Sequence, residues 1–429
     1  MIKLNVFLYS SIIDRKVYDE FGDVLGVLKD VYVTAEEGYP RAIGYRVKRG
    51  SVMYEYEFRT IEFYLNDSNK VLIKTKGSKE ILPRSYSFLL SQNLLDKSIV
   101  DVNGKKVVRV NDLRIAEIAG EYRVIAVETG SSALYRRKGL ESVARIITKF
   151  MKKEMEDQVI MWDDVESLEL IKDSLQISVP YKKLSTLHPA DLADILETLD
   201  SKNRRKIFET LDEDLVADTL EEMEPEYKGT AIKELSELKQ AEILENLPND
   251  EIADILDELD DESREKILFN LEKEDADEVK ELLSYEDETA GSIMNKDFIA
   301  LNIDISVKET IEIFKETEPD EEVMYSVYII DSEERLLGSV SLKDLVMNDS
   351  DVKLKDIMND KIQTANYKES LSELVDKVTK YDLLSIPVLD EENRLLGVVL
   401  THDVVDEILL PAWRKKSKKN VEYIKRLWI

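Results

Sequence analysis

The sequence has 429 residues, of which 43% are hydrophobic and 35% charged, with no Cys and only two His. Its formal net charge of −30 argues against a nucleic-acid surface, because phosphates repel carboxylates. The absence of Cys excludes disulfides, thiolate zinc sites and cysteine nucleophiles. No apolar run approaches the roughly 18 residues of a membrane span. We therefore expect a globular, soluble and cytoplasmic chain of about two to four domains.

Residues 1–184 are expected to be rich in β-strands, since Val, Ile, Tyr and Phe alternate with polar residues between turn signals such as Asn103-Gly104. This region repeats itself at an offset of 82 residues. The matching residues are Asp14, Asp19, Gly22 and Asp30 in the first copy and Asp96, Asp101, Gly104 and Asp112 in the second. We predict two copies of one small β-barrel, residues 1–85 and 86–184, in which the repeated Asp and Gly residues form turns and bind no metal.

The pattern "D..V.D..G..LG.L.DVYV" and its copy "LDKSIVDVNGKKVVRVNDLRI" resemble the PRC-barrel family. Members of that family are docking modules, so the resemblance implies partner binding. One of them is a ribosome-maturation factor, which keeps a ribosome-associated role open. The basic insertion around Arg136 favours such a role, and the overall negative charge opposes it.

The stretch 187–290 carries most of the charge, with 35 Asp and Glu against 11 Lys and Arg in residues 191–290. Its apolar residues recur every twelve positions in two registers. The first register is Ile195, Ile207, Thr219, Ala231, Ile243, Ile255, Ile267 and Val279; the second is Leu199, Leu211, Met223, Leu235, Leu247, Leu259, Leu271 and Leu283. A unit of twelve residues holds one short helix that cannot bury its own apolar face. The pattern therefore predicts an α-solenoid whose true repeat is a 24-residue hairpin.

Several of these units place a carboxylate directly after a small residue, as in Ala217-Asp218 and Ala253-Asp254. Stacked helices would align these acids along one edge, where they would attract cations. His188 and Pro189 precede the first unit, and we interpret His188 as a helix cap and not as a metal ligand.

The run "HPADLADILETLD" and the closing "LLSYEDETAGSIMNKDFIALNIDISVKETIEIF" resemble the cytoplasmic part of MgtE-type magnesium transporters. In that family a superhelical N domain precedes two CBS domains. The resemblance implies an N domain at 185–290 and CBS domains at 291–350 and 351–410, of which the second repeats Asp331…Gly338 as Asp390…Gly397, 59 residues later. The expected fold class is thus multidomain α+β: two β-barrels, an α-solenoid and an α/β CBS pair.

The resemblance also implies Mg²⁺ sites between the N domain and the CBS pair. Mg²⁺ keeps several waters and accepts one or two carboxylates, so it suits a loose acidic seam. Asp250 and Asp254 are four residues apart and would share one helix face. The positions that match the family's acidic positions are Asp218, Asp250, Asp254, Asp382, Asp403 and Asp406. We expect Mg²⁺ to replace repulsion by attraction and to close the N domain on the CBS pair.

CBS clefts in many proteins bind adenine nucleotides through Gly-x-x-Ser/Thr-x-x-Asp, which occurs here with Ser341, Lys343 and Asp344. The second copy has Leu400 where the hydroxyl belongs, and the family's adenine-stacking positions carry Ser326 and Leu383. Ser341 and Asp344 equally fit a helix cap. An adenine nucleotide is therefore the alternative ligand to Mg²⁺.

Residues 411–429 hold seven Lys and Arg against one Glu, with Trp413 and Trp428. This basic tail fits peripheral contact with the inner face of a membrane, and it equally fits folding back on the acidic solenoid.

No nucleophile–base set and no phosphate-binding glycine loop is recognisable, so we expect no enzyme. The preferred hypothesis is a soluble magnesium-sensing regulator, homodimeric through its CBS domains, that controls a separate membrane transporter or another effector. The alternative is an adenine-nucleotide-sensing CBS regulator or scaffold.

Overall fold

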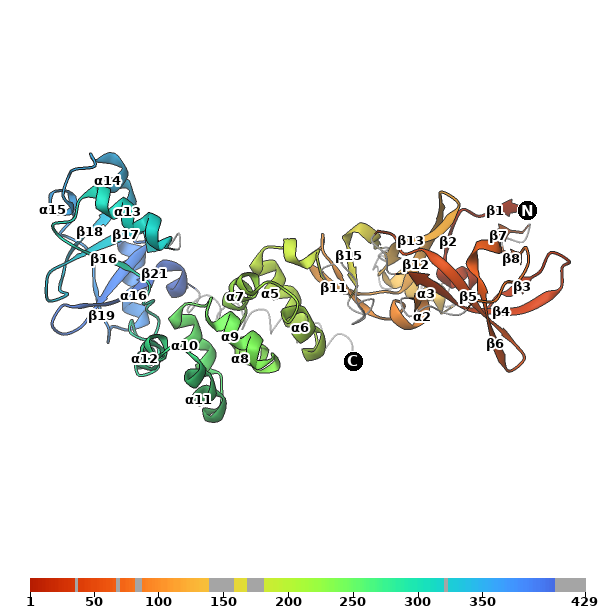
Figure 1. The fold of residues 1–429 in the computed structure, drawn as a ribbon, viewed down its shortest axis with the longest axis horizontal. Helices are drawn as coiled ribbons and strands as arrows, with labels where there is room; N and C mark the ends of the chain where they lie inside the picture. The colour runs from red at the N-terminus through yellow and green to blue at the C-terminus, as the bar shows by residue number, and fades with distance from the viewer. Residues whose placement is uncertain are drawn as a thin grey trace, which may run out of the picture. The chain divides into compact units, whose positions relative to one another are not determined.

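The computed structural model describes residues 1–34, 38–66, 70–81, 87–138, 158–167, 181–319 and 323–405. It divides into two compact units, residues 1–223 and 224–429, and each is described here by itself (Figure 1). The first unit holds the β-rich region and the first solenoid helices, and the second holds the remaining solenoid helices and two small α/β halves (Figure 1). No helix among the described residues is both long and apolar enough to cross a membrane. The basic tail and most of the basic insertion lie outside the described residues.

The β-rich region forms one large sheet of the order β1-β7-β8-β3-β4-β5-β6, on which β9 pairs with β4, and two smaller sheets, β11-β10-β15 and β14-β13-β12-β2. Its strands are β1 Ile2–Lys3, β2 Val6–Leu8, β3 Lys16–Tyr18, β4 Val24–Thr34, β5 Ala42–Arg49, β6 Val52–Glu57, β7 Ile61–Leu65, β8 Val71–Thr75, β9 Ser87–Leu89, β10 Ser98–Asp101, β11 Lys106–Arg109, β12 Asp112–Ile118, β13 Glu121–Glu128, β14 Val159–Met161 and β15 Val165–Ser167. Short helices α1 (Tyr9–Ile12), α2 (Leu90–Asn93) and α3 (Ser131–Arg137) connect them.

The two sequence copies exchange one strand each, β2 and β9. Strand β2 of the first copy runs antiparallel to β12 of the second, with Phe7 opposite Ile115. Strand β9 of the second copy runs antiparallel to β4 of the first, with Phe88 opposite Val33. One hydrophobic core accordingly contains buried residues from both copies. The two predicted barrels are therefore interlocked, because each one is completed by a strand of the other.

Two buried carboxylates fasten the exchanged strands. Asp112 accepts hydrogen bonds from the backbone N–H and the hydroxyl of Ser10, at 3.0 and 2.5 Å. Asp30 accepts the equivalent two bonds from Ser91 and a third from the hydroxyl of Tyr9 at 2.6 Å. Both aspartates are almost fully buried, at 3% exposure for Asp30 and 0% for Asp112. The prediction that these two residues form turns is wrong, since they join segments about 60 and 100 residues apart.

The other repeated aspartates do form turns. Asp14 and Asp96 adopt the left-handed conformation, with φ of 60° and 64°. Asp19 accepts bonds from the backbone N–H of Phe21 and Asp23, and Asp101 accepts one from Gly104 at 2.8 Å. The turn prediction is confirmed for these four aspartates.

The solenoid consists of short helices separated by single turns, as the twelve-residue period predicts (Figure 1). Their bounds are α5 Pro189–Thr198, α6 Ser201–Phe208, α7 Glu213–Glu221, α8 Pro225–Glu234, α9 Glu237–Leu244, α10 Asn249–Asp257, α11 Asp261–Asn270 and α12 Lys273–Leu282. Every residue of the first register is buried, and of the second register only Leu271 and Leu283 are partly exposed. Alternate helices contact one another, α5 with α7 in the first unit and α8 with α10 and α10 with α12 in the second, which confirms the 24-residue repeat. His188 caps α5 by accepting a bond from the N–H of Ala190.

The two α/β halves have the same topology. In each half a short strand lies parallel to a second strand that forms an antiparallel hairpin with a third. The elements are β16 Ile299–Asn302, α13 Val307–Thr317, β17 Ser326–Ile330, β18 Leu336–Ser341 and α14 Leu342–Met347 in the first half, then α15 Leu354–Ile357, β19 Ala365–Asn366, α16 Leu371–Tyr381, β20 Ser385–Leu389, β21 Leu395–Leu400 and a helix that begins at residue 401.

The solenoid is joined firmly to this pair within the second unit. Lys296 Nζ donates to Glu281 of α12 at 2.9 Å, and the rings of Tyr285 and Tyr367 lie 5.6 Å apart. The backbone N–H groups of Ala290 and Gly291 also donate hydrogen bonds to the carbonyls of Glu369 and Tyr367. The end of the solenoid is therefore anchored to the second half of the pair.

The serine–aspartate bonds predict a measurable loss of stability. Ser10→Ala and Ser91→Ala each remove a hydroxyl donor from a buried carboxylate, and a hydrogen bond to a charged group contributes about 1.5–3 kcal/mol. We expect each variant to lower the free energy of unfolding of the first unit by about that amount. Urea unfolding followed through buried Trp162, with Trp413 and Trp428 replaced by Phe, measures it. Ser332→Ala, in an exposed turn, is the control, and a loss no larger than that of the control would contradict the proposed fastening.

Candidate functional site

The first turn of α10 carries three consecutive polar residues, Asn249, Asp250 and Glu251, and two of them bind neighbouring helices. Asn249 Nδ2 donates to Glu278 of α12 at 2.9 Å. Glu251 forms an ion pair with the buried Lys228 of α8. These contacts fix the orientation of the helix turn, and the side chain of Asp250 takes part in neither of them.

Asp250 is half-buried, and its Oδ1 atom is fully buried with no hydrogen-bond partner among the described residues. Burial raises the pKa of this carboxyl well above its ordinary value, and the negative charges of Glu251, Asp403 and Asp254 raise it further. Its own backbone N–H opposes the shift. A buried carboxylate surrounded by other carboxylates is costly unless a proton or a cation compensates it.

Asp403 lies in the helix that begins at residue 401, in the second half of the pair. Its Oδ2 accepts a bond from the N–H of Leu400 at 3.3 Å, and its Oδ1 lies 3.0 Å from Nε2 of the neighbouring His402. Because position 400 carries no hydroxyl, this carboxylate lacks the short side-chain bond that Ser341 gives to Asp344 in the first half, at 2.6 Å. Asp403 is therefore bound less tightly to its own helix cap.

The site can attract a cation but offers few direct ligands. Among the described residues, no three Asp, Glu or His side chains converge closely enough to chelate a metal ion. A hydrated Mg²⁺ needs only one or two carboxylates and retains its other waters. The unpartnered Oδ1 of Asp250 and the nearby charge of Asp403 fit an ion held in that way.

The other expected metal residues lie in different surroundings. Asp254 is exposed on α10, one turn beyond Asp250, and its charge acts on Asp250. Asp382 is exposed at the end of α16 in the left-handed conformation, with φ of 54°. Asp218 is exposed on α7 in the first unit, and Asp406 lies outside the described residues. Of the expected metal residues, Asp254 and Asp403 thus act electrostatically on Asp250.

The nucleotide motif of the first half forms a helix cap. Ser341 Oγ accepts a bond from the N–H of Asp344 at 3.2 Å, and Asp344 Oδ2 accepts one from the N–H of Ser341 at 3.3 Å. Lys343 lies between them in α14. In the second half, Leu400 is buried in a cluster with Tyr328 and Val398. Apolar side chains therefore take the place of a hydroxyl there.

The sequence-based interpretation did not include Glu251, Lys228, Asn249 and Glu278, which fix Asp250 in position. The signal available was three polar residues in succession at the start of a predicted helix. Their partners on α8 and α12 lie one 24-residue repeat away on either side, so the repeat itself could have identified them.

Comparison with known families agrees with this architecture. Residues 187–288 match the MgtE intracellular N domain, residues 290–351 and 354–410 match the CBS domain, and residues 4–79 match the PRC-barrel domain. None of these three is a model of an enzyme. A solved structure described as the soluble part of a magnesium transporter is 31% identical, with a TM-score of 0.51, and the match covers 54% of this chain and 91% of that one. The chain contains an MgtE cytosolic domain.

Two further relatives belong to the same family. A structure described as the cytosolic domain of the Mg²⁺ channel MgtE in complex with ATP is 30% identical, with a TM-score of 0.51, over 52% of this chain and 92% of that one. The magnesium transporter MgtE of Enterococcus faecalis (strain ATCC 700802 / V583) is 37% identical over 133 residues, which are 31% of this chain and 29% of the transporter. This chain therefore matches less than a third of the length of that transporter.

The raised pKa of Asp250 predicts a pH-dependent stability in the absence of divalent cations. The folded state keeps the Asp250 proton at pH values where the unfolded state has lost it, so stability falls as pH rises from about 4 through the folded pKa. Asp250→Asn mimics the protonated form and should be the more stable protein at pH 7. Near pH 4 the difference should disappear.

Thermal unfolding in EDTA at a series of pH values measures the effect. The control is Asp261→Asn, which removes the same charge from a side chain that is 99% exposed on α11. If the two variants had equal thermal stability at all pH values, the surroundings of Asp250 would not raise its pKa.

Proposed function

We propose that this protein is a non-enzymatic Mg²⁺-sensing regulator. The observation that carries the proposal is the buried carboxylate oxygen of Asp250 on the solenoid, which has no hydrogen-bond partner among the described residues and lies within electrostatic reach of Asp403 on the CBS pair. The family match of both elements supports it. Asp250 and Asp403 would hold the hydrated ion, and Asp254 would add to the negative potential.

The mechanism follows from the charges. Without Mg²⁺, the carboxylates of α10 and of the helix at residue 401 repel each other, and the contact between these two elements is weak. Asp250 and Asp403 would each be attracted to a Mg²⁺ ion between them, and α10 would then be held against the CBS pair. The ion shifts the equilibrium only as far as it binds the closed arrangement more tightly than the open one. Because α12 is anchored to the pair, we place the movement in the helices that precede it.

The closed arrangement would be the signal to an effector. We propose a separate magnesium transporter as that effector, since the solenoid and the CBS pair match the cytosolic region of such proteins. The PRC-barrel region is the proposed contact, and residues 411–429 would add a basic segment at the inner face of the membrane. The protein would then be cytoplasmic with peripheral attachment.

An adenine nucleotide is the second candidate ligand. A similar chain was solved in complex with ATP, and the spacing of Gly338, Ser341 and Asp344 is present here. Against it, Asp344 is already bound to Ser341, and Leu400 occupies the corresponding position of the other half in an apolar cluster. A nucleotide would have to compete with the helix cap of α14.

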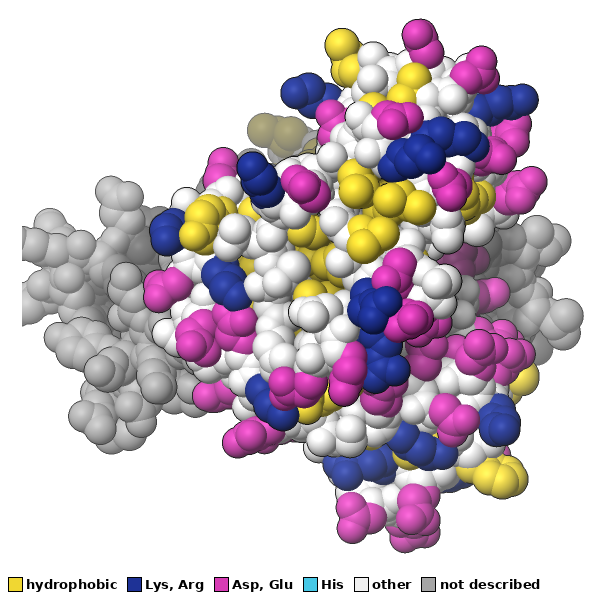
Figure 2. Space-filling model, turned by 90° about the vertical axis from the view of Figure 1, so that its left-hand side faces the viewer, with side chains coloured by type: hydrophobic (Ala, Val, Ile, Leu, Met, Phe, Trp, Pro, Cys, Tyr) yellow, Lys and Arg dark blue, Asp and Glu magenta, His cyan; other side chains and the backbone are white. Residues whose placement is uncertain are grey.

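We propose that two chains associate through the CBS pair. Figure 2 shows apolar side chains gathered on one face of the molecule, with charged side chains around them. Four exposed apolar residues of the CBS pair occupy equivalent positions in the two halves, 59 residues apart: Tyr325 is equivalent to Leu384, and Val346 to Val405. A surface with its own internal two-fold suits the self-complementary contact of a dimer.

Small-angle scattering across a Mg²⁺ titration tests these proposals together. We expect compaction at millimolar Mg²⁺ that NaCl at equal ionic strength does not reproduce, since screening weakens repulsion without bridging it. Asp250→Asn should weaken the compaction, and Asp261→Asn should leave it intact. The forward scattering should report the mass of a dimer, and Val346→Asp with Leu384→Asp should reduce it to that of a monomer.

A radius of gyration that does not change with Mg²⁺ would contradict the proposed sensor. The acidic face of the solenoid would then be only a solvated surface. Repeating the titration with ATP decides the second candidate. If ATP shifts the Mg²⁺ concentration at the midpoint of compaction, and Asp344→Ala abolishes that shift, nucleotide binding is supported. An unchanged midpoint would contradict nucleotide binding.

A further inference from the structure

Two large apolar side chains of the solenoid are exposed, one on α9 and one on α11. Leu238 is 72% exposed and Phe269 is 89% exposed. Neither residue belongs to the two apolar registers, so the stacking of the helices does not account for them. Lys266 Nζ donates to Glu237 at 2.5 Å, which places these parts of α11 and α9 side by side. One exposed apolar residue is common on a protein surface, whereas two on neighbouring helices indicate a contact surface.

A small crevice lies beside these residues, between α9, α11 and the start of α12. Its apolar wall consists of Ala241 and Leu244 of α9 together with Ile267 and Leu271. Leu238 lies one helical turn before Ala241, and therefore on the same side of α9. The exposed apolar surface thus continues into the crevice.

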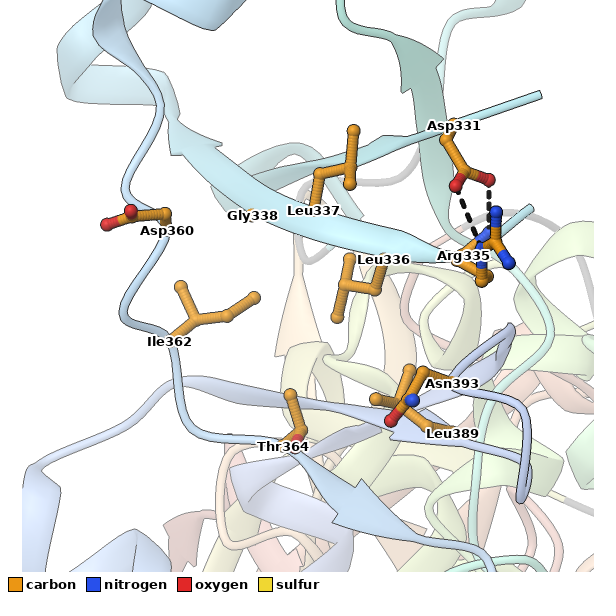
Figure 3. Close-up of a pocket in the computed structure, with 10 residues that line it drawn as sticks. All are labelled: Asp331, Arg335, Leu336, Leu337, Gly338, Asp360, Ile362, Thr364, Leu389 and Asn393. Atoms are coloured by element: carbon orange, nitrogen blue, oxygen red, sulfur yellow. Dashed lines mark hydrogen bonds and ion pairs between the residues drawn. The ribbon is translucent and has the colours of Figure 1, made fainter. Parts of the chain in front are cut away.

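The volume of the crevice excludes a small-molecule ligand. It is about 50 Å³, whereas ligand pockets measure roughly 300–1,000 Å³. One water needs about 10–15 Å³ of such a volume, so the crevice has room for roughly one side chain. The cavity between the halves of the CBS pair is larger, at about 390 Å³, but Gly338 of the nucleotide motif lines it, so it belongs to the nucleotide candidate above (Figure 3). The crevice on the solenoid therefore suits an inserted side chain of a polypeptide.

The rim of the crevice is acidic. Glu245, Glu272 and Asp275 line it, and no Lys or Arg is among the described residues of the lining. None of these three carboxylates forms an ion pair with a described residue. Residues 237–282 as a whole hold 18 Asp and Glu against 5 Lys and Arg. An apolar crevice with such a rim fits a segment that carries both cationic and apolar side chains.

We propose that the basic tail of this chain docks on this surface. The tail holds seven Lys and Arg against one Glu. Val421, Ile424 and Trp428 recur in it at spacings of three and four, and Lys425 and Arg426 stand between them. This sequence pattern is typical of a segment with one apolar stripe and cationic flanks. The tail thus supplies both kinds of side chain that the surface requires.

Each part of the surface has its counterpart in the tail. One apolar side chain of the tail would fill the crevice, and its apolar neighbours would cover Leu238 and Phe269. The Lys and Arg side chains would pair with Glu245, Glu272 and Asp275 at the rim. Ion pairs with exposed carboxylates contribute little one by one, so the apolar contacts supply most of the binding and the charges select the partner.

The tail begins close enough to the solenoid to reach this surface. The described chain ends at Val405 in the second half of the CBS pair, and that half is bonded through Glu369 to Ala290, eight residues after α12. Sixteen residues separate Val405 from Val421, and they span up to about 55 Å when extended. The helices of the solenoid are only about 12–15 Å long. The length of the chain therefore allows the apolar stripe of the tail to meet α9 and α11.

Docking would control when the tail can meet a membrane. The same Lys and Arg side chains cannot contact the carboxylates of the solenoid and the phosphates of a lipid surface at once. The membrane contact proposed above would therefore require release of the tail from the solenoid. Docking does not depend on the proposed Mg²⁺ site, since none of Asp250, Asp254 and Asp403 lines the crevice.

A nitroxide on the tail tests the proposal in the full chain. The protein has no Cys, so Asn420→Cys provides a single attachment site. The methyl resonances of Leu244 and Ile267, which are 4% and 5% exposed in the wall of the crevice, are recorded by NMR in EDTA with the nitroxide oxidised and then reduced. We expect the oxidised nitroxide to broaden both resonances. The broadening should persist on dilution and in the Val346→Asp, Leu384→Asp background, because the tail belongs to the same chain.

Three variants separate docking from a general attraction between a basic tail and an acidic protein. Leu238→Ser with Phe269→Ser removes apolar surface without any change of charge and should abolish the broadening. Ile424→Ser in the tail should abolish it as well, with the solenoid left intact. Phe21→Ser makes the same kind of change at a side chain that is 85% exposed in the β-rich region, and it should leave the broadening unchanged.

Resonances that the nitroxide does not broaden would overturn the proposal, and binding of the same chain to phosphatidylserine vesicles would then assign the tail to a membrane alone. Broadening that Leu238→Ser with Phe269→Ser leaves unchanged would also overturn it, since charge alone would then hold the tail. Broadening that is lost on dilution or in the Val346→Asp, Leu384→Asp background would overturn docking within one chain. Thermal unfolding shows whether the solenoid variant is folded, and if it is not, Ile424→Ser decides the outcome.

Discussion

None of the small units in this chain can bury its apolar surface alone, and the whole structure depends on that constraint. The short helix of each twelve-residue unit covers its apolar face only when another helix stacks on it. Strands β2 and β9, one from each β-rich copy, each complete a sheet of the other copy. The two halves of the CBS pair also bury surface against each other, since buried Tyr328 of the first half meets Ser385 of the second with 2.9 Å between their hydroxyl oxygens. Stability therefore resides in the contacts between copies.

The same constraint concentrates charge at the junctions. Stacked helices place their apolar registers inside, so the abundant carboxylates are confined to edges and helix ends. Most of them remain in water, where their repulsion is screened. Asp250 is the exception, because the contacts of Asn249 and Glu251 with α12 and α8 hold its helix turn beside the CBS pair. A packing requirement thus produces a carboxylate whose energy depends on protons and cations.

Much of this architecture could be predicted from the sequence, for physical reasons. The twelve-residue registers require only that apolar residues are buried, and they identified the inner face of every solenoid helix. The duplication at 59 residues likewise predicted two equivalent halves. The strand exchange could not be predicted, because β2 and β9 have similar apolar patterns and fit either sheet equally well. The burial of Asp30 and Asp112 follows from that exchange, so it could not be predicted either.

The site was predictable in part. Asp250 and Asp403 could be named from family positions, but the burial of a single oxygen atom depends on how α8, α10 and α12 stack. Sequence patterns specify which surfaces are buried, and side-chain volumes then decide where space remains.

The exchanged strands also determine when this protein can fold during its synthesis. Strand β2 leaves the ribosome early, yet its partner β12 ends at Ile118, more than 100 residues later. At about 5–20 residues per second, β2 waits for roughly 5–20 s before its sheet can be completed. During that interval the first copy presents an open edge on β4, which β9 later covers. Two nascent chains on neighbouring ribosomes could exchange the same strands with each other, so slow translation of the first 120 residues would favour an entangled dimer.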